Sequence, residues 1–274
     1  MSLLKVSSGT LELDAFHGTH RQAIDLVSGA TLEVNESGTL GSISGAGDLK
    51  IDPAGAGLRS LEFGADDGST TYSGNITDTG DDVFSKVGTG TWTVTGDITG
   101  LGTLNISEGV VSIGNGGTTG STTAGITNNA ALVFNRSNSI THSASISGTG
   151  SLEKLGAGTL TLSGNNGYTG TTTVNGGTLA LSGGSALADT SAVTLANVAG
   201  VSLSLNASET IGSLAGGGGT GGNVNIGSHR LTLSGNNSFP TTYSGQLSGS
   251  TGGVTKNGSG TFIMNNSSVN YDGD

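Results

Sequence analysis

Apolar and hydroxyl residues alternate over short stretches of this chain. Examples are TLTL at 159–162, TLAL at 178–181, VSLSL at 201–205 and RLTL at 230–233. A period of two is typical of a strand that buries one face. Gly, Asn and Ser, which tolerate positive φ at corners, separate the stretches. The pattern predicts many short β-strands, and no helical stripe of period 3.6 accompanies it.

Two arrangements of such strands compete. Asn175-Gly176 favours a hairpin, because Asn-Gly is the strongest short hairpin signal. Stacked coils, each of three strands and three corners, are favoured by motifs that recur along the chain and can stack on their own kind. We therefore predict an all-β, parallel β-helix with coils of about 22–25 residues. Residues 1–274 are interpreted as one elongated solenoid.

The recurring motifs are specific. Lys-x-Gly-small-Gly-Thr starts at Lys86, Lys154 and Lys256. A second element precedes each copy, as TYSGNIT at 71–77, THSASIS at 141–147 and TYSGQLS at 242–248. A longer duplication relates residues 32–95 to residues 203–265 with an offset of 203 − 32 = 171. Repetition over this length predicts that the two stretches share one architecture.

Composition supports a narrow solenoid over a sandwich or a disordered chain. The chain has 274 residues, of which 52 are Gly. Aromatic residues make up only 4% and charged residues 11%, while the hydrophobic residues make up 32% and occur at regular positions. A sandwich core of this size would need more large side chains, and disordered chains usually combine low hydrophobicity with high charge. Cysteine is missing, which excludes disulfides and cysteine metal sites.

Charge and hydropathy narrow the partners. The formal net charge of −11 argues against a nucleic-acid partner, because phosphate binding needs clustered Lys and Arg. No apolar run approaches the roughly 20 residues of a transmembrane helix. The N-terminus lacks the layout of a signal peptide. If the protein is exported, we expect this chain to be a piece of it.

Candidate catalytic chemistry is sparse. Gly-x-Ser-x-Gly, the phosphate-binding Gly-x-x-x-x-Gly-Lys-Ser/Thr and His-Glu-x-x-His do not occur. His17 and His20 are the best metal candidates, but on a strand they would face opposite sides, and a polar loop is favoured. His142 replaces the Tyr of the two sister motifs and is interpreted as a corner or packing residue. We predict no catalytic, cofactor-binding or metal-binding residues, and no cofactor.

Acidic and basic side chains at the predicted corners are further candidate sites. Asp66-Asp67 and the group Asp78, Asp81 and Asp82 could hold calcium through oxygen ligands. The nonapeptide calcium motif is missing, and solvated loops are favoured. The lysine of each repeat recurs at one place in the predicted coil, so a surface role beside the Gly-rich corner is expected.

The run from Gly148 to Leu181, GTGSLEKLGAGTLTLSGNNGYTGTTTVNGGTLAL, resembles the passenger-associated transport repeat of Gram-negative autotransporters, the type V secretion proteins. The best match covers 148–181. The resemblance implies a right-handed parallel β-helix that passes through a C-terminal outer-membrane barrel outside this chain. It implies display at the bacterial cell surface, where the repeats assist passage and folding. The resemblance further implies a structural or adhesive function, in which the segment contacts a glycan or protein of a host or neighbouring cell.

Two further expectations concern the ends and the alternative function. Val6–Leu13 aligns with Val174–Leu181, and Tyr271 aligns with Tyr168, so the chain is expected to begin and end within a repeat. Open ends predict end-to-end self-association. The alternative function is a glycan-active β-helix, such as a polysaccharide lyase or hydrolase. It would need paired carboxylates in a groove, and because the acids lie mostly at loops, a non-enzymatic protein is favoured.

Overall fold

The computed structural model describes residues 3–13, 22–52, 60–235, 241–266 and 269–271. Their regular elements are all β-strands, and no helix in this part of the chain is long and apolar enough to cross a membrane. The chain divides into two compact units, Met1–Val133 and Phe134–Asp274. His17 and His20 lie outside the described residues.

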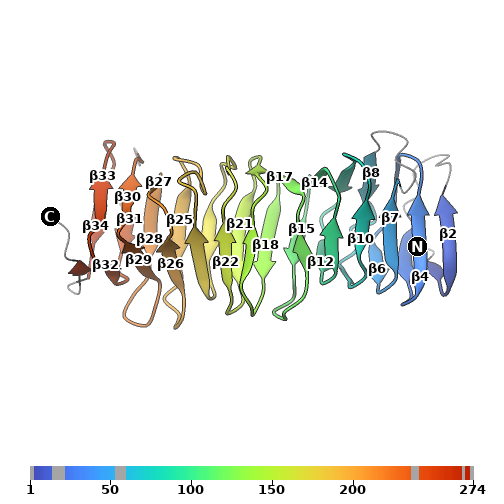
Figure 1. Ribbon diagram of the computed structural model, residues 1–274, viewed down its shortest axis with the longest axis horizontal. Coiled ribbons are helices and arrows are strands. Elements are labelled where there is room, and N and C mark those ends of the chain that lie inside the picture. The colour runs from blue at the N-terminus through green and yellow to red at the C-terminus, as the bar shows by residue number, and fades with distance from the viewer. Residues whose placement is uncertain (1–2, 14–21, 53–59, 236–240, 267–268, 272–274) are drawn as a thin grey trace. The chain divides into compact units, whose positions relative to one another are not determined.

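Unit 1 consists of three parallel sheets, and from residue 23 onward each turn of the chain adds one strand to each sheet. The first sheet contains β1 (Leu3–Val6), β3 (Ala23–Leu26), β6 (Ile43–Gly45), β9 (Thr70–Tyr72), β12 (Thr91–Val94) and β15 (Val110–Ile113). The second contains β2 (Gly9–Leu13), β4 (Ala30–Val34), β7 (Asp48–Ile51), β10 (Ile76–Asp78), β13 (Asp97–Thr99) and β16 (Ser121–Thr122), several of which lie side by side in Figure 1. The third contains β5 (Gly38–Thr39), β8 (Ser60–Phe63), β11 (Val83–Lys86), β14 (Thr103–Ile106) and β17 (Gly125–Asn128).

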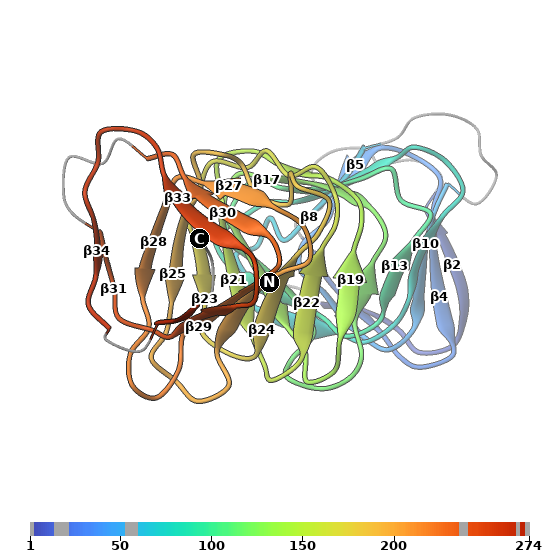
Figure 2. The ribbon, with the colours of Figure 1, turned by 60° about the vertical axis from the view of Figure 1, so that its left-hand side comes forward.

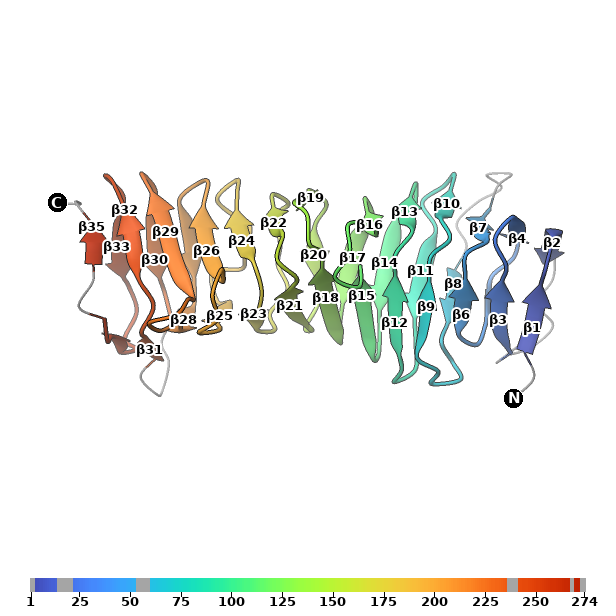
Figure 3. The ribbon, with the colours of Figure 1, turned by 90° about the horizontal axis from the view of Figure 1, so that it is seen from below.

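Unit 2 is also a stack of parallel turns; β18 (Ala131–Asn135) contains the boundary between the units. Its first sheet contains β21 (Ser151–Leu155), β23 (Thr172–Val174), β25 (Ala192–Leu195), β28 (Ser213–Gly216), β31 (Thr241–Tyr243) and β34 (Phe262–Met264). The second, seen face-on in Figure 3, contains β19 (Ile140–His142), β22 (Thr159–Leu162), β24 (Thr178–Leu181), β26 (Ser202–Leu205), β29 (Asn223–Gly227), β32 (Leu247–Gly249) and β35 (Val269–Tyr271). The third side holds β20 (Ile146–Ser147) and, later, β27 (Glu209–Ile211), β30 (Arg230–Leu233) and β33 (Gly253–Lys256), which Figure 2 shows apart from the first sheet.

Strand register decides between hairpins and coils. Leu179 of β24 lies opposite Leu160 of β22 and Leu203 of β26, and both pairings are parallel. Asn175-Gly176 is therefore a corner that joins β23 to β24 in different sheets, and the hairpin interpretation is wrong. The predicted all-β parallel solenoid is confirmed, with about 12 turns.

Turn length varies more than the sequence suggested. The step from Ile24 to Ile43 is 43 − 24 = 19 residues, whereas the step from Gly45 to Tyr72 is 72 − 45 = 27 residues. The predicted 22–25 residues were too narrow a range. Parallel pairing fixes only the strands, so corners can lengthen without changing the stacked register.

The core of each unit is a column of inward side chains from successive turns. In unit 1 the column includes an aromatic group: Phe63 stacks on Phe84 with ring centroids 4.2 Å apart, and Trp92 meets Phe63 edge-on at 4.6 Å. Glycines allow the corners to stack as closely as the strands. A Cβ on Gly96 would lie 1.9 Å from the carbonyl oxygen of Gly74, so only glycine fits there.

Two turns of unit 2 depart from the three-strand plan. Residues 163–170 and 182–191 form the third side of successive turns, and neither segment contains a strand. The prediction of three strands in every coil is wrong for these turns. Two buried polar side chains, Asn166 and Glu209, connect this side instead.

Candidate functional site at the lysine-capped corners

The lysine of the recurring motif is the last inward residue before a corner. Lys86 in β11 and Lys154 in β21 are each 1% exposed. The Nζ of Lys86 donates hydrogen bonds to the carbonyl oxygens of Val87 at 2.7 Å and Gly88 at 2.6 Å. The stem therefore fills the core, while the ammonium group satisfies carbonyls of the glycine-rich corner.

Lys154 extends the same arrangement to the next turn. Its Nζ donates to Leu155 O at 2.6 Å and Gly156 O at 2.9 Å, and also to Gly176 O at 3.0 Å. Gly176 belongs to the corner that follows β23, which stacks on β21. One buried ammonium group thus fastens two consecutive corners to each other.

Burial changes the acidity of these lysines. Desolvation lowers the pKa of Lys154 from 10.5 to about 8. Desolvation also lowers the pKa of Lys86, but the carboxylates of Asp67, Glu108 and Asp66 oppose that shift. The charge of Lys86 is therefore balanced by a rim of acids, whereas that of Lys154 is held by carbonyl dipoles.

Lys256 at the end of β33 makes the same contacts in a more open setting. Its Nζ donates to Gly235 O and Gly258 O, both at 3.2 Å, and to Asn257 O. Here the neighbouring turn is the preceding one, and the lysine is exposed. All three motif lysines thus cap corner carbonyls.

Two features of the lysines differ from expectation. Lys86 and Lys154 are buried, so the predicted surface role is wrong for them, although their place beside the Gly-rich corner is as expected. The lysines also do not share one place in the coil. Lys86 and Lys256 end third-side strands, and Lys154 lies in a first-sheet strand. A corner of the same sequence can therefore form at different sides of a turn.

Tyrosines perform a related task. Tyr72 and Tyr243 are inward residues that end β9 and β31, and their hydroxyl groups donate to carbonyl oxygens of corners. The hydroxyl of Tyr72 reaches Gly47 O at 2.6 Å, and that of Tyr243 reaches Gly222 O at 3.0 Å. Burial raises the pKa of both phenols. Long, polar-tipped side chains at the last inward position are thus a general capping device in this chain.

His142 occupies the position of these tyrosines in the middle copy of the motif. It ends β19, is 2% exposed and packs against Phe134 with ring centroids 5.8 Å apart. Its interpretation as a corner or packing residue is confirmed.

Side-chain amide and carboxylate groups link the strand-free side of unit 2. Asn166 accepts a hydrogen bond from Ile146 N at 2.7 Å and donates to Ala186 O at 2.8 Å. The carboxylate of Glu209 accepts from Leu187 N at 2.9 Å and from Ala186 N at 3.2 Å. Desolvation raises the pKa of Glu209, and these two backbone bonds oppose the shift. The two side chains replace the backbone ladder that strands would supply.

The acidic side chains at corners bind backbone groups, either of a neighbouring turn or of their own corner. Asp66 accepts from Ser42 N and Ser42 Oγ, both at 2.8 Å, and Asp67 accepts from Thr89 N at 2.7 Å. Asp78 accepts from Thr79 N at 2.8 Å and Asp82 N at 3.3 Å. Within the described part of the chain no group of three or more His, Cys, Asp or Glu side chains is placed to hold a metal ion. Asp66, Asp67 and Asp78 therefore act as corner caps, while Asp67 and Asp81 are exposed, as expected of solvated loops.

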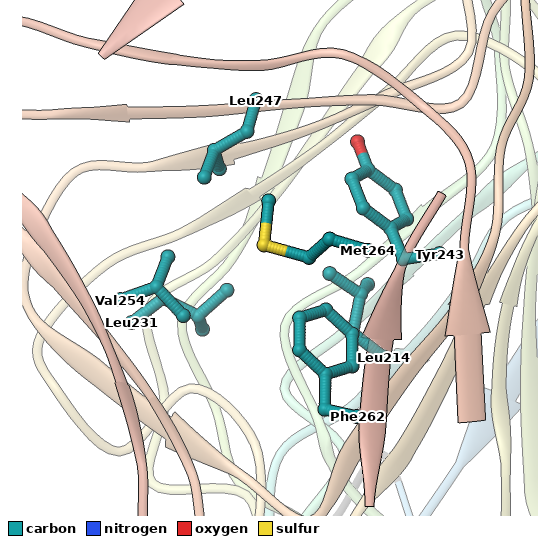
Figure 4. Close-up of a pocket in the computed structure, with 7 residues that line it drawn as sticks. All are labelled: Leu214, Leu231, Tyr243, Leu247, Val254, Phe262 and Met264. Atoms are coloured by element: carbon teal, nitrogen blue, oxygen red, sulfur yellow. The ribbon is translucent and has the colours of Figure 1, made fainter. Parts of the chain in front are cut away.

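An apolar pocket lies at the last described turns of unit 2. Figure 4 shows its lining side chains gathered around one space: Leu214, Leu231, Tyr243, Leu247, Val254, Phe262 and Met264. Met264 is 40% exposed, so the pocket opens at the last first-sheet strand. The hydroxyl group of Tyr243, which belongs to the lining, donates to Gly222 O.

Comparison with known sequences assigns the repeats. The family of the passenger-associated transport repeat matches residues 84–113, 152–181 and 254–274. The chain carries passenger-associated transport repeats. Each matched segment contains one of the corner-capping lysines, Lys86, Lys154 or Lys256. The resemblance seen in the sequence is confirmed.

A curated relative agrees with this assignment. The chain is 35% identical over 173 residues to the adhesin BmaC autotransporter of Brucella suis biovar 1 (strain 1330). The alignment covers 63% of this chain and 5% of that protein, so the chain spans a small part of the relative's length. No solved structure matches the chain.

Proposed function

We propose that this transport-repeat chain is a structural, surface-displayed segment of an autotransporter passenger. The supporting observation is that each matched repeat contains a lysine whose ammonium group caps the carbonyls of a corner. Lys154 binds the corners of two consecutive turns, and Lys256 binds its own corner and the preceding one. In these two copies the repeat is therefore a unit that ties one turn to the next, whereas Lys86 caps its own corner.

Such a unit fits a chain that folds turn by turn as it emerges from a pore. A buried ammonium group is tolerated only where it finds its acceptors. Shifting the strand by one residue would turn the lysine to the other face and place its neighbour inside. The lysine therefore stabilises one strand register over the others. A turn that folds in this register keeps the exported part of the chain outside the cell.

The route and the partners follow from the family. The segment is linked to a C-terminal outer-membrane translocator domain, is secreted, and is displayed on the bacterial surface. Its contacts there are adhesive, towards a glycan or protein of a host or neighbouring cell. The name of the BmaC adhesin supports this role. The segment acts without catalysis, and no observation favours a glycan-active protein.

Lys154→Met in the full-length passenger tests the proposal. The half-buried Lys50, which lies on the outward face of β7 and pairs with Glu33 at 2.8 Å, provides the matched control Lys50→Met. We expect Lys154→Met to reduce the amount of passenger that external protease and antibody can reach on whole cells, at equal total expression. Lys50→Met is expected to leave display unchanged. Equal display of both variants and the parent would contradict a role of the capped corner in passage.

A further inference from the structure

Four Asn-Gly pairs occur in the chain, at 115–116, 166–167, 175–176 and 257–258. In such a pair the backbone nitrogen of glycine can attack the side-chain carbonyl carbon of asparagine. Glycine offers no side chain in the way and the widest choice of backbone angles. Whether the reaction proceeds depends on whether the attacking N–H and the asparagine amide are free to approach each other.

Two of the pairs are held by bonds between turns. Gly167 N donates to Ile146 O at 2.8 Å, and both polar atoms of the buried Asn166 side chain are hydrogen-bonded. Gly176 N donates to Lys154 O at 3.2 Å, and Asn175 Nδ2 donates to Glu153 Oε1 at 2.6 Å. Attack at either pair requires the local opening of a stacked corner.

The pair at 257–258 lies in an exposed corner that is only partly held. Nζ of Lys256 donates to the carbonyl oxygens of both Asn257 and Gly258, and Asn257 N donates to Leu233 O at 2.8 Å. The peptide that must swing towards the side chain is therefore anchored on both sides. This corner is expected to react more slowly than an unanchored one.

The pair at 115–116 lies in the loop between β15 and β16 and is free of such bonds. Asn115 and Gly116 are exposed, and neither makes a hydrogen bond to any residue that the structure describes. Gly116 has a φ of 92°. A Cβ on Gly117 would lie 3.4 Å from Oδ1 of Asn115, so the side chain folds over the peptide that follows it.

We propose that Asn115 is a site of spontaneous deamidation. The nitrogen of Gly116 forms a bond to Cγ of Asn115 and loses its proton, the bond from Cγ to the side-chain nitrogen breaks, and ammonia leaves. Water then opens the cyclic imide at either carbonyl and yields aspartate or isoaspartate. No oxidant, reductant or cofactor is required.

The modification adds charge to the more acidic half of the molecule. Unit 1 contains 15 acidic and 5 basic residues, a net charge of −15 + 5 = −10, against −5 + 4 = −1 for unit 2. A carboxylate at 115 appears with time after folding. If the segment is displayed as proposed above, the fraction of displayed molecules that carry this carboxylate increases with the time since folding.

Peptide mapping by mass spectrometry tests the proposal. The purified chain is incubated at mildly alkaline pH, folded or in urea, and the conversion of amide to carboxyl is followed at each pair. In the folded chain Asn115 should convert at least about tenfold faster than Asn166 and Asn175, which corresponds to an opening free energy of about 1.4 kcal/mol. In urea the four pairs should convert at similar rates.

Gly116→Ala serves as the matched variant. It should slow conversion at Asn115 in the folded chain and leave conversion at Asn175 unchanged. Folded chain in which Asn166 or Asn175 converts as quickly as Asn115 would overturn the proposal. Conversion at Asn257 without conversion at Asn115 would overturn it as well.

Discussion

Lys154 brings a positive charge into the interior of a turn, where the described groups around it are carbonyl oxygens rather than carboxylates. Two effects oppose each other there. Desolvation of the ammonium group costs free energy, and three hydrogen bonds to carbonyl oxygens offset this cost. The same inward column holds Val174 and Leu195 in the following turns, so an aliphatic side chain fits the space. The lysine thus contributes specificity of register more than net stability.

The pH dependence of stability separates these effects. With a pKa of about 8 in the folded state and 10.5 as the ordinary value, the folded chain binds fewer protons than the unfolded chain between those pH values. The free energy of unfolding attributable to Lys154 should therefore rise from about pH 8 to pH 10.5 and stay flat below pH 8. Lys154→Met should change stability at pH 7 by no more than about 1 kcal/mol and lose this rise.

Urea unfolding of the parent and of Lys154→Met across this pH range provides the measurement. The difference between the two curves isolates Lys154 from the tyrosines, which titrate in both proteins. Parallel curves would show that the ammonium group is not desolvated in the folded chain.

At the scale of the element, the strand-free side of unit 2 depends on side chains. Asn166 joins the turns of Ile146 and Ala186, and its removal leaves a buried N–H and a buried carbonyl without partners. Asn166→Ala should destabilise unit 2 by about 2 kcal/mol. Asn165→Ala, at the exposed neighbouring position, should cost less than about 0.5 kcal/mol. Hydrogen exchange at the Ile146 amide measures the effect locally. Equal protection of this amide in the two variants would contradict the prediction.

The same side shows where sequence reasoning reached its limit. Alternation in TLTL and TLAL predicts β22 and β24 because inward and outward positions differ in polarity. The corners marked by glycine could be predicted from the sequence equally well. Asn166 and Glu209 are not, because nothing local distinguishes a buried asparagine that bonds to turns twenty residues away from an exposed one in a loop.

The burial of Lys86 and Lys154 could not be predicted for a related reason. A lysine next to glycines is usually a solvated corner residue, and only the stacked carbonyls of Gly156 and Gly176 make an interior site for Lys154. Sequence repetition located the residue, and the parallel stack defined what it does.

At the scale of the whole molecule, β1 and β34 are among the edge strands that pair on one side only within the described residues. β34 pairs only with β31 and borders the apolar pocket of unit 2 (Figure 4), and β1 pairs only with β3. Met264 and Leu3, which lie on these two strands, are 40% and 58% exposed. Because all strands run parallel, β34 of one copy can pair with β1 of a second copy. We expect end-to-end association that increases with protein concentration.

Sedimentation velocity over a range of concentrations measures this association. Met264→Glu places a charge at the mouth of the pocket, where pairing would bury it unpaired, and should shift the chain towards monomer. Val198→Glu alters a side chain that is 50% exposed and lies on neither edge strand, so it should associate like the parent. The two variants carry the same added charge, which separates loss of the apolar contact from general repulsion. A parent chain that remains monomeric at the highest concentration, or two variants that behave alike, would show that these edges do not pair.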